Sequence, residues 1–171
     1  EELAAGLDRI ALPKEIREKI DTMVPARWSR SNPIDLAGGE TRDTIPEVLD
    51  VVCAHPDVDA VIHLGIGIQA ASANVLKSGE FYPDYGLERI VDFHERQDRR
   101  YAQAAREASE RHGIPVLTAT ELVHSDRHYG NPGPLGVKEE GRLSHASAPR
   151  AVRALRAMVD DAEYRERIAK G

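Results

Sequence analysis

Two glycine turns are the places in this sequence where the backbone could bind a ligand. One, at residues 38–39, precedes a segment that predicts a helix, and the other, at residues 65–68, ends an apolar run. Free N–H groups at a helix N-terminus favour an anion such as phosphate or a carboxylate, and glycine lets the backbone approach it closely. The residues predicted to form this anion-binding edge are Gly38, Gly39, Gly65, Ile66, Gly67 and Ile68. For each turn taken alone, tight-turn geometry without a ligand is the alternative.

Three histidines are candidates for chemistry. His63 comes just before the second glycine turn, where it either faces a ligand or packs as a core histidine. His124 and His128 have the four-residue spacing of two metal ligands on one helix face, but the glycine, proline and polar residues around them argue against a helix. We therefore predict no metal site in this chain.

Ser144 and His145 form an adjacent pair of a hydroxyl and an imidazole. An activated serine would suit a hydrolase, but no acidic residue is visibly placed to orient the imidazole. Cys53 lies among apolar neighbours, so packing in the core is its expected role. The sequence therefore predicts no catalytic residue, and a free-standing hydrolase that uses Ser144 and His145 remains an alternative.

Length and composition favour one globular domain over residues 1–171. Of the 171 residues 41% are hydrophobic and 30% are charged, and the formal net charge is -6. An acidic chain is unsuited to nucleic acid, and no apolar run is long enough to cross a membrane. A single cysteine and the absence of a signal segment favour the cytoplasm. The start at Glu1, without methionine and in what reads as a helix tail, predicts a piece of a longer polypeptide.

Strands and helices alternate along the chain and would position the glycine turns at one edge of a sheet. The expected strands lie at 31–36, 58–64 and 114–117 and around Leu143. This order indicates an α/β fold with a doubly wound parallel sheet, in which ligands bind beyond the carboxyl ends of the strands.

The expected helices begin near residues 16, 44, 69, 87 and 149. The longest of them runs from Leu87 to His112, and Gly113 is its predicted cap. Its narrow apolar stripe comprises Ile90, Phe93, Tyr101, Ala104 and Ala108. Residues 124–141, rich in glycine, proline and charge, are predicted to form a loop.

The segment Asn32-Pro33-Ile34-Asp35-Leu36, followed by Gly38-Gly39, resembles a motif of the NDP-forming acyl-CoA synthetases. This group includes ADP-forming acetate–CoA ligase and is related to succinyl-CoA synthetase. Later pieces agree in order, and they are His55-Pro56-Asp57-Val58, the turn from Gly65, Gly113-Ile114-Pro115-Val116 and Pro149-Arg150-Ala151-Val152. The resemblance covers residues 30–70 and 113–159. Asn32 therefore joins His63 as a possible ligand-facing residue.

The resemblance implies the C-terminal flavodoxin-like domain of the ligase portion, with three α/β/α layers. The implied reaction converts acyl-CoA, phosphate and NDP into acid, CoA and NTP, through an acyl phosphate and a phosphohistidine. Residues 65–68 match the loop that contacts the acid substrate in that family, and residues 38–39 match its neighbouring anion-binding turn. The strand that the family places first is absent here, so the sheet is expected to lack that strand.

Other domains of the same enzyme would supply the remaining functions that the resemblance implies. CoA-binding, phosphohistidine and ATP-grasp domains would bind CoA, ATP or ADP, and Mg²⁺, so no cofactor is expected on this chain. The family's phosphorylated histidine lies in a Ser-His-Thr-Gly-Ala context of the preceding domain, so His145 is not assigned that role. The alternative function is a regulatory ligase-like sensing domain fused to a protein acetyltransferase.

Overall fold

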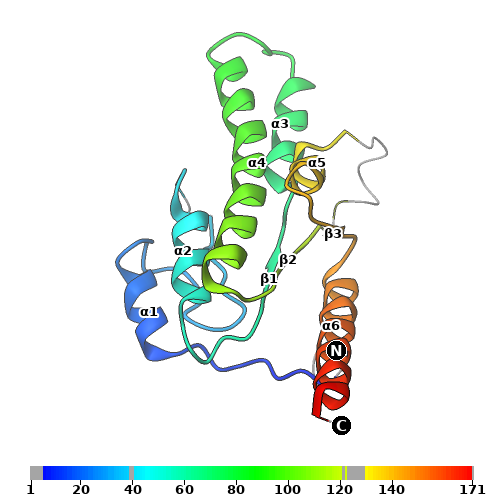
Figure 1. Cartoon of the computed structure of the whole chain (residues 1–171). Helices are drawn as coiled ribbons and strands as arrows, with labels where there is room; N and C mark the ends of the chain where they lie inside the picture. Colours follow the sequence, from blue (N-terminus) through cyan, green and yellow to red (C-terminus); the bar gives the residue numbers. More distant parts are fainter. Residues whose placement is uncertain (1–5, 39–40, 121, 123–129, 171) are drawn as a thin grey trace.

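The computed structural model describes residues 6–38, 41–120, 122 and 130–170, and these residues form six helices and a small parallel sheet of three strands (Figure 1). In chain order the elements are α1 (Lys14–Asp21), α2 (Thr44–Cys53), β1 (Val61–Leu64), α3 (Ile68–Lys77), α4 (Leu87–His112), β2 (Val116–Ala119), α5 (Pro132–Glu139), β3 (Ser144–His145) and α6 (Ala148–Lys170). The predicted α/β class is confirmed.

The three strands lie in chain order, and both neighbouring pairs are parallel. His63 of β1 is in register with Thr118 of β2, which is in register with Ser144 of β3. Helices α3 and α4 connect the first two strands, and α5 lies between the second and the third. Parallel strands require such crossovers, because the chain must return to the same end of the sheet before the next strand.

Helices cover both faces of the sheet (Figure 1). On one face Val116 packs with residues of α2 and α4, among them Cys53 and Ala105. On the other face Leu117 and Ala119 pack against Ala151 of α6. Adjacent residues of a strand project to opposite faces, so this alternation along β2 assigns each strand residue to one helix layer.

A separate apolar cluster holds the N-terminal region to the sheet. It contains Ile16 and Ile20 of α1, Val48 of α2, and Trp28 from the segment between these helices. All four side chains are nearly inaccessible to solvent. The indole Nε1 of Trp28 donates a hydrogen bond to the Asp21 carboxylate at 2.8 Å. This cluster anchors the segment that leads to the first glycine turn.

The strand predicted at residues 31–36 is not formed. Ser29 Oγ accepts the N–H of Asp35 at 3.0 Å, and the Asp35 carboxylate accepts the N–H of Ala37 at 2.8 Å. Such side-chain bonds satisfy the backbone locally and compete with a strand ladder, and Pro33 has no N–H to contribute. The first glycine turn therefore follows a compact loop rather than a strand.

The other three strands are present, with shifted boundaries. The predicted run 58–64 is a strand only over Val61–Leu64, and the predicted 114–117 appears as Val116–Ala119. The last strand is the pair Ser144–His145, while Leu143 is 79% exposed. These shifts leave the predicted order of the elements unchanged.

Helix α4 occupies the predicted range, Leu87–His112, and Gly113 caps it in a left-handed conformation with φ of 70°. Its predicted apolar stripe was partly wrong, because Ile90 and Phe93 are each 40% exposed. The residues of α4 that are buried are Val91, Gln97, Asp98, Tyr101, Ala102, Ala105, Ala108 and Ser109. Three of them, Gln97, Asp98 and Ser109, are polar, and Asp98 bonds to the second glycine turn.

The loop predicted at 124–141 contains a helix, α5 (Pro132–Glu139). Asn131 caps this helix by accepting the N–H of Gly133 at 2.9 Å, and Pro132 occupies the first turn, where its missing N–H costs nothing. The rest of the predicted loop includes residues 124–129, which lie outside the described residues.

Candidate functional site

A small polar pocket lies where the first glycine turn meets the beginning of α3 and the side of α4. Its volume is about 210 Å³, and the residues that line it are Gly38, Thr41, Gln69, Phe93, His94, Gln97 and Tyr101. Gly38 belongs to the first predicted turn, and Gln69 directly follows the second. The fold therefore brings Gly38 of the first turn near the start of α3, while residues 65–68 of the second turn do not line the pocket.

Hydrogen bonds between side chains hold the polar wall of this pocket in place. His94 Nδ1 lies 2.5 Å from Gln69 Oε1, which joins α4 to the first turn of α3. Gln97 Nε2 donates to the carbonyl oxygen of Arg42 and, at 3.2 Å, to the hydroxyl of Tyr101. The pocket thus presents amide, phenol and imidazole groups in fixed positions, next to the apolar ring of Phe93.

The second glycine turn binds an anion that belongs to the chain itself. The carboxylate of Asp98 accepts the N–H of Gly67 at 2.9 Å and the N–H of Ala70 at 2.7 Å. Asp98 has no exposed surface, and its burial raises the pKa of the carboxyl above the ordinary value, while the two N–H donors lower it in part. These two N–H groups at the start of α3 are therefore already satisfied.

The remaining residues of the two turns take different roles. The N–H groups of Gly65 and Ile66 donate to the carbonyl of Ala119, and Ile66 is completely buried. Ile68 is 51% exposed. The carbonyl of Gly38 accepts a bond from the Arg27 guanidinium at 3.1 Å. Gly39 lies outside the described residues.

Asn32 forms a hydrogen bond to the backbone and does not line the pocket. Its side-chain amide donates to the carbonyl of Ile10 at 3.0 Å, which ties the loop of residues 31–37 to the N-terminal stretch. Asn32 is not among the residues that line the pocket.

Asn131 fastens the start of α5 to the second glycine turn. Its Nδ2 donates to the carbonyl of Gly67 at 3.2 Å, while its Oδ1 accepts the N–H of Gly133. Asp98 therefore binds the backbone N–H of Gly67 and Asn131 binds its backbone carbonyl, so helices α3, α4 and α5 meet at this residue.

His63 lies beneath the pocket, between the sheet and α4. Its ring meets that of Tyr101 edge to face, with 6.2 Å between centroids, and its buried Nδ1 has no hydrogen-bond partner within the described part of the chain. Burial lowers the pKa of His63 to about 4, so the imidazole is neutral at physiological pH. Tyr101 lines the pocket and His63 does not.

We expect His63 to make the stability of the protein depend on pH. As the pH falls below about 6.5, this imidazole takes up a proton in the unfolded chain but not yet in the folded one, which favours unfolding. Its contribution to the free energy of unfolding is therefore present above about pH 6.5 and is lost as the pH falls toward 4. Between pH 7 and pH 5, urea unfolding should show that the parent loses about 2 kcal/mol more stability than His63→Gln. His145→Gln, which replaces a more exposed histidine, should keep most of the parent's pH dependence. Equal losses in the parent and His63→Gln would show that His63 is not responsible.

Ser144 and His145 are neighbours on β3 and project to opposite faces of the sheet. Ser144 shares a row with Thr118, and His145 shares a row with Ala119 on the α6 side. Ser144 Oγ is buried without a hydrogen-bond partner among the described residues. This geometry does not bring the hydroxyl to the imidazole, so it offers no support for the hydrolase alternative.

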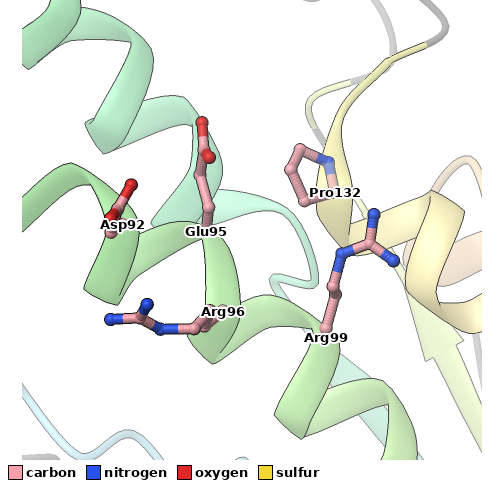
Figure 2. A pocket seen from close by; sticks show the side chains of 5 residues that line it. All are labelled: Asp92, Glu95, Arg96, Arg99 and Pro132. Carbon is pink, nitrogen blue, oxygen red and sulfur yellow. The ribbon is translucent and has the colours of Figure 1, made fainter.

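A second, more charged pocket lies between α4 and the start of α5 (Figure 2). Its volume is about 270 Å³, and it is lined by Asp92, Glu95, Arg96, Arg99 and Pro132. Glu95 pairs with Lys77, and Arg99 pairs with Glu139. Because these ion pairs neutralise much of the charge of the pocket, its attraction for an anion is weaker than the two arginines alone would give.

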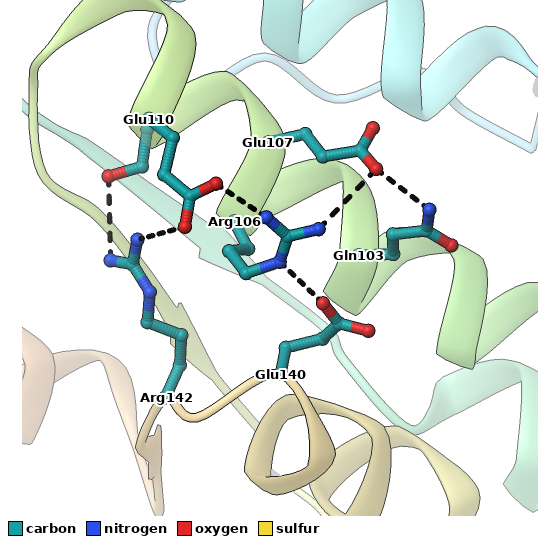
Figure 3. A network of polar contacts seen from close by, with 7 residues as sticks. Gln103, Arg106, Glu107, Glu110, Glu140 and Arg142 are labelled. Carbon is teal, nitrogen blue, oxygen red and sulfur yellow. Dashed lines mark hydrogen bonds and ion pairs between the residues drawn. The ribbon is translucent and has the colours of Figure 1, made fainter.

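Ion pairs around Arg106 hold the end of α5 against α4 (Figure 3). The guanidinium of Arg106 contacts Glu110 one turn along α4 and Glu140 just after α5, each at 2.5 Å. Arg142 extends the network to Glu110 at 3.8 Å. This network lies away from the polar pocket and serves to position α5.

The described residues contain no group of three metal-ligating side chains, and none of their helices is long and apolar enough to cross a membrane. His124 and His128, whose spacing resembles that of metal ligands, lie outside the described residues.

The sequence interpretation missed the polar residues that α4 contributes to the site. Asp98 lies seven residues after Val91 and seven before Ala105, both of which are buried. A charged residue within a buried helical stripe signals a carboxylate that must be paired. Gln69, His94 and Gln97 carried no comparable signal, because polar residues at such positions are common on exposed helix faces.

The described structure is an α/β domain with a small polar pocket beyond the carboxyl end of β1. The chain matches no protein-family model, and no curated protein or solved structure matches it. Its function is therefore argued from the pocket and from the residues of the motif at 32–39.

Proposed function

We propose that this chain is the substrate- and phosphate-binding domain of an NDP-forming acyl-CoA synthetase, with a flavodoxin-like fold. The observation that supports this proposal best is the pocket that unites Gly38 with the start of α3. In the family that residues 32–39 resemble, the matching turns contact the acid substrate and an anion. The ligand proposed here is a small carboxylic acid or its acyl phosphate.

The size of the pocket supports a small ligand. A volume of about 210 Å³ is below the range of about 300–1,000 Å³ that is typical of pockets for drug-sized molecules. A nucleotide or CoA would exceed it. This agrees with a division of labour in which CoA-binding, phosphohistidine and ATP-grasp domains hold CoA, ATP or ADP, and Mg²⁺, while this domain holds the acid.

The chemistry of the lining also suits an oxygen-rich ligand. Gln69 and Gln97 offer amide groups and His94 an imidazole, while Phe93 provides an apolar surface for a short acyl chain. Specific pockets commonly combine a few polar groups with such an apolar wall. Without the other domains, this chain is proposed to bind the acid but not to complete the reaction.

We expect propionate and acetyl phosphate to bind this pocket with dissociation constants of about 1 mM, equivalent to about −4 kcal/mol. Backbone amide NMR shifts in titrations of the protein should change at Gly38, Thr41 and Gln69. ATP and CoA serve as control ligands and should leave these signals unchanged. Shifts confined to the charged pocket near Arg96 and Arg99, or no shifts at all, would show that the proposed function is wrong.

A further inference from the structure

His94 is the one histidine in the lining of the polar pocket, and its ring is oriented by Gln69. The amide oxygen of Gln69 can only accept, so Nδ1 of His94 carries the hydrogen in their 2.5 Å contact. The other ring nitrogen, Nε2, is then the atom left to serve a ligand. A histidine held in this way has a defined tautomer and a defined direction.

A buried negative charge lies close to this imidazole. Asp98 is one helical turn after His94 on α4, and the two groups attract each other electrostatically. Among the described residues, the Tyr101 phenol lies in the same pocket wall, and the Glu95 carboxylate, next to His94 on α4, pairs with Lys77 of α3. Lys77 and Glu95 pair with each other, so their charges largely cancel beside the imidazole.

We propose that the imidazolium of His94, oriented by Gln69, binds the anionic oxygen of the ligand, so that binding at this pocket requires a proton on His94. This inference rests on the proposed function and names the residue that carries it. Protonated His94 donates from Nδ1 to Gln69 and from Nε2 to the ligand, and a charge-assisted hydrogen bond is about twice as strong as a neutral one. Once the proton leaves, Nε2 has only a lone pair to offer, which repels an anion.

The test is a propionate titration by calorimetry at about pH 6 and about pH 8, a range in which propionate stays fully ionised while histidine titrates. For the parent protein we expect the affinity to fall at least about tenfold as the pH rises. Asn at position 94 keeps a donor for Gln69 but lacks Nε2, so His94→Asn should bind about tenfold more weakly at the lower pH and lose the pH dependence. His94→Arg should bind at both pH values.

His112→Asn is the matched control. His112 is also a partly buried histidine of α4, but it bonds to Asp50 at 2.8 Å, at the far end of the helix. This variant should keep the affinity and the pH profile of the parent.

The outcomes separate the two proposals. If the parent binds propionate equally at both pH values and His94→Asn binds as well as the parent, the role of His94 is wrong while the proposed function stands. If the parent binds neither propionate nor acetyl phosphate at any pH, the proposed function itself is wrong.

Discussion

Replacing Asp98 by alanine is expected to lower the free energy of unfolding by about 3 kcal/mol, because it leaves two buried N–H groups without an acceptor. The N–H groups of Gly67 and Ala70 begin helix α3, and water cannot reach the site, since Asp98 itself has no exposed surface. Urea unfolding followed by circular dichroism measures the loss. The variant should also lose order at the start of α3, visible as faster amide hydrogen exchange there.

Two further variants define what the carboxylate contributes. Asp98→Asn keeps the shape but replaces one acceptor oxygen with a donor that faces an N–H group, so it should be intermediate in stability. Asp92→Ala removes an exposed carboxylate from the same helix and should change the stability by no more than about 0.5 kcal/mol. A loss for Asp98→Ala as small as that for Asp92→Ala would contradict the role assigned to Asp98.

Replacing Gly133 by alanine is expected to destabilise the fold by about 3 kcal/mol, at the upper end of the cost of overpacking. A Cβ atom at this position would lie 2.4 Å from the backbone nitrogen of Gly67 and 2.5 Å from its Cα. A shift of either atom would disturb the bonds that Asp98 and Asn131 make to the backbone N–H and carbonyl of Gly67. In an unhindered helix the same change would stabilise the protein by up to about 1 kcal/mol, so the sign of the effect is informative.

Gly130→Ala is the control for this substitution. A Cβ at Gly130 would meet no atom of the described residues within 4 Å, so this variant should unfold at nearly the same urea concentration as the parent. The comparison holds the chemical change constant and removes the contact with Gly67. A Gly133→Ala variant as stable as Gly130→Ala would mean that α5 does not lie against the Gly67 turn.

The parts of the fold that sequence could predict are those with local signals. The length of helix α4 and its Gly113 cap are indicated by residues close together in the sequence, and the predicted range was confirmed. The strand at 31–36 was wrong, because the bonds of Ser29 and Asp35 to nearby backbone outweigh a short apolar run. Helix α5 was missed although Asn131 and Pro132 form a local N-terminal signal, because the glycines and prolines of the segment indicate a loop. The contact of Asn131 with Gly67, 64 positions earlier, could not be inferred locally.

The predicted anion-binding edge stays a prediction, and the composition of the pocket was not predictable from sequence. Of the described turn residues, Gly38 lines the pocket, whereas Gly65, Ile66, Gly67 and Ile68 do not. Which side of α4 faces this pocket depends on how α4 packs against α3, and no local pattern specifies that rotation. The side chains of Gln69 and His94 therefore meet through tertiary structure, although their positions are 25 apart in the sequence.

The carboxylate of Asp98 has a consequence for selectivity at the N-terminus of α3. Because Asp98 is part of the same folded chain, it competes for the Gly67 and Ala70 N–H groups at an effective concentration far above that of any free metabolite. Free anions in solution are therefore not expected to displace the Asp98 carboxylate from this helix N-terminus. In the function proposed above, ligand discrimination would then fall to the neighbouring pocket wall, which contains the amides of Gln69 and Gln97 and the imidazole of His94.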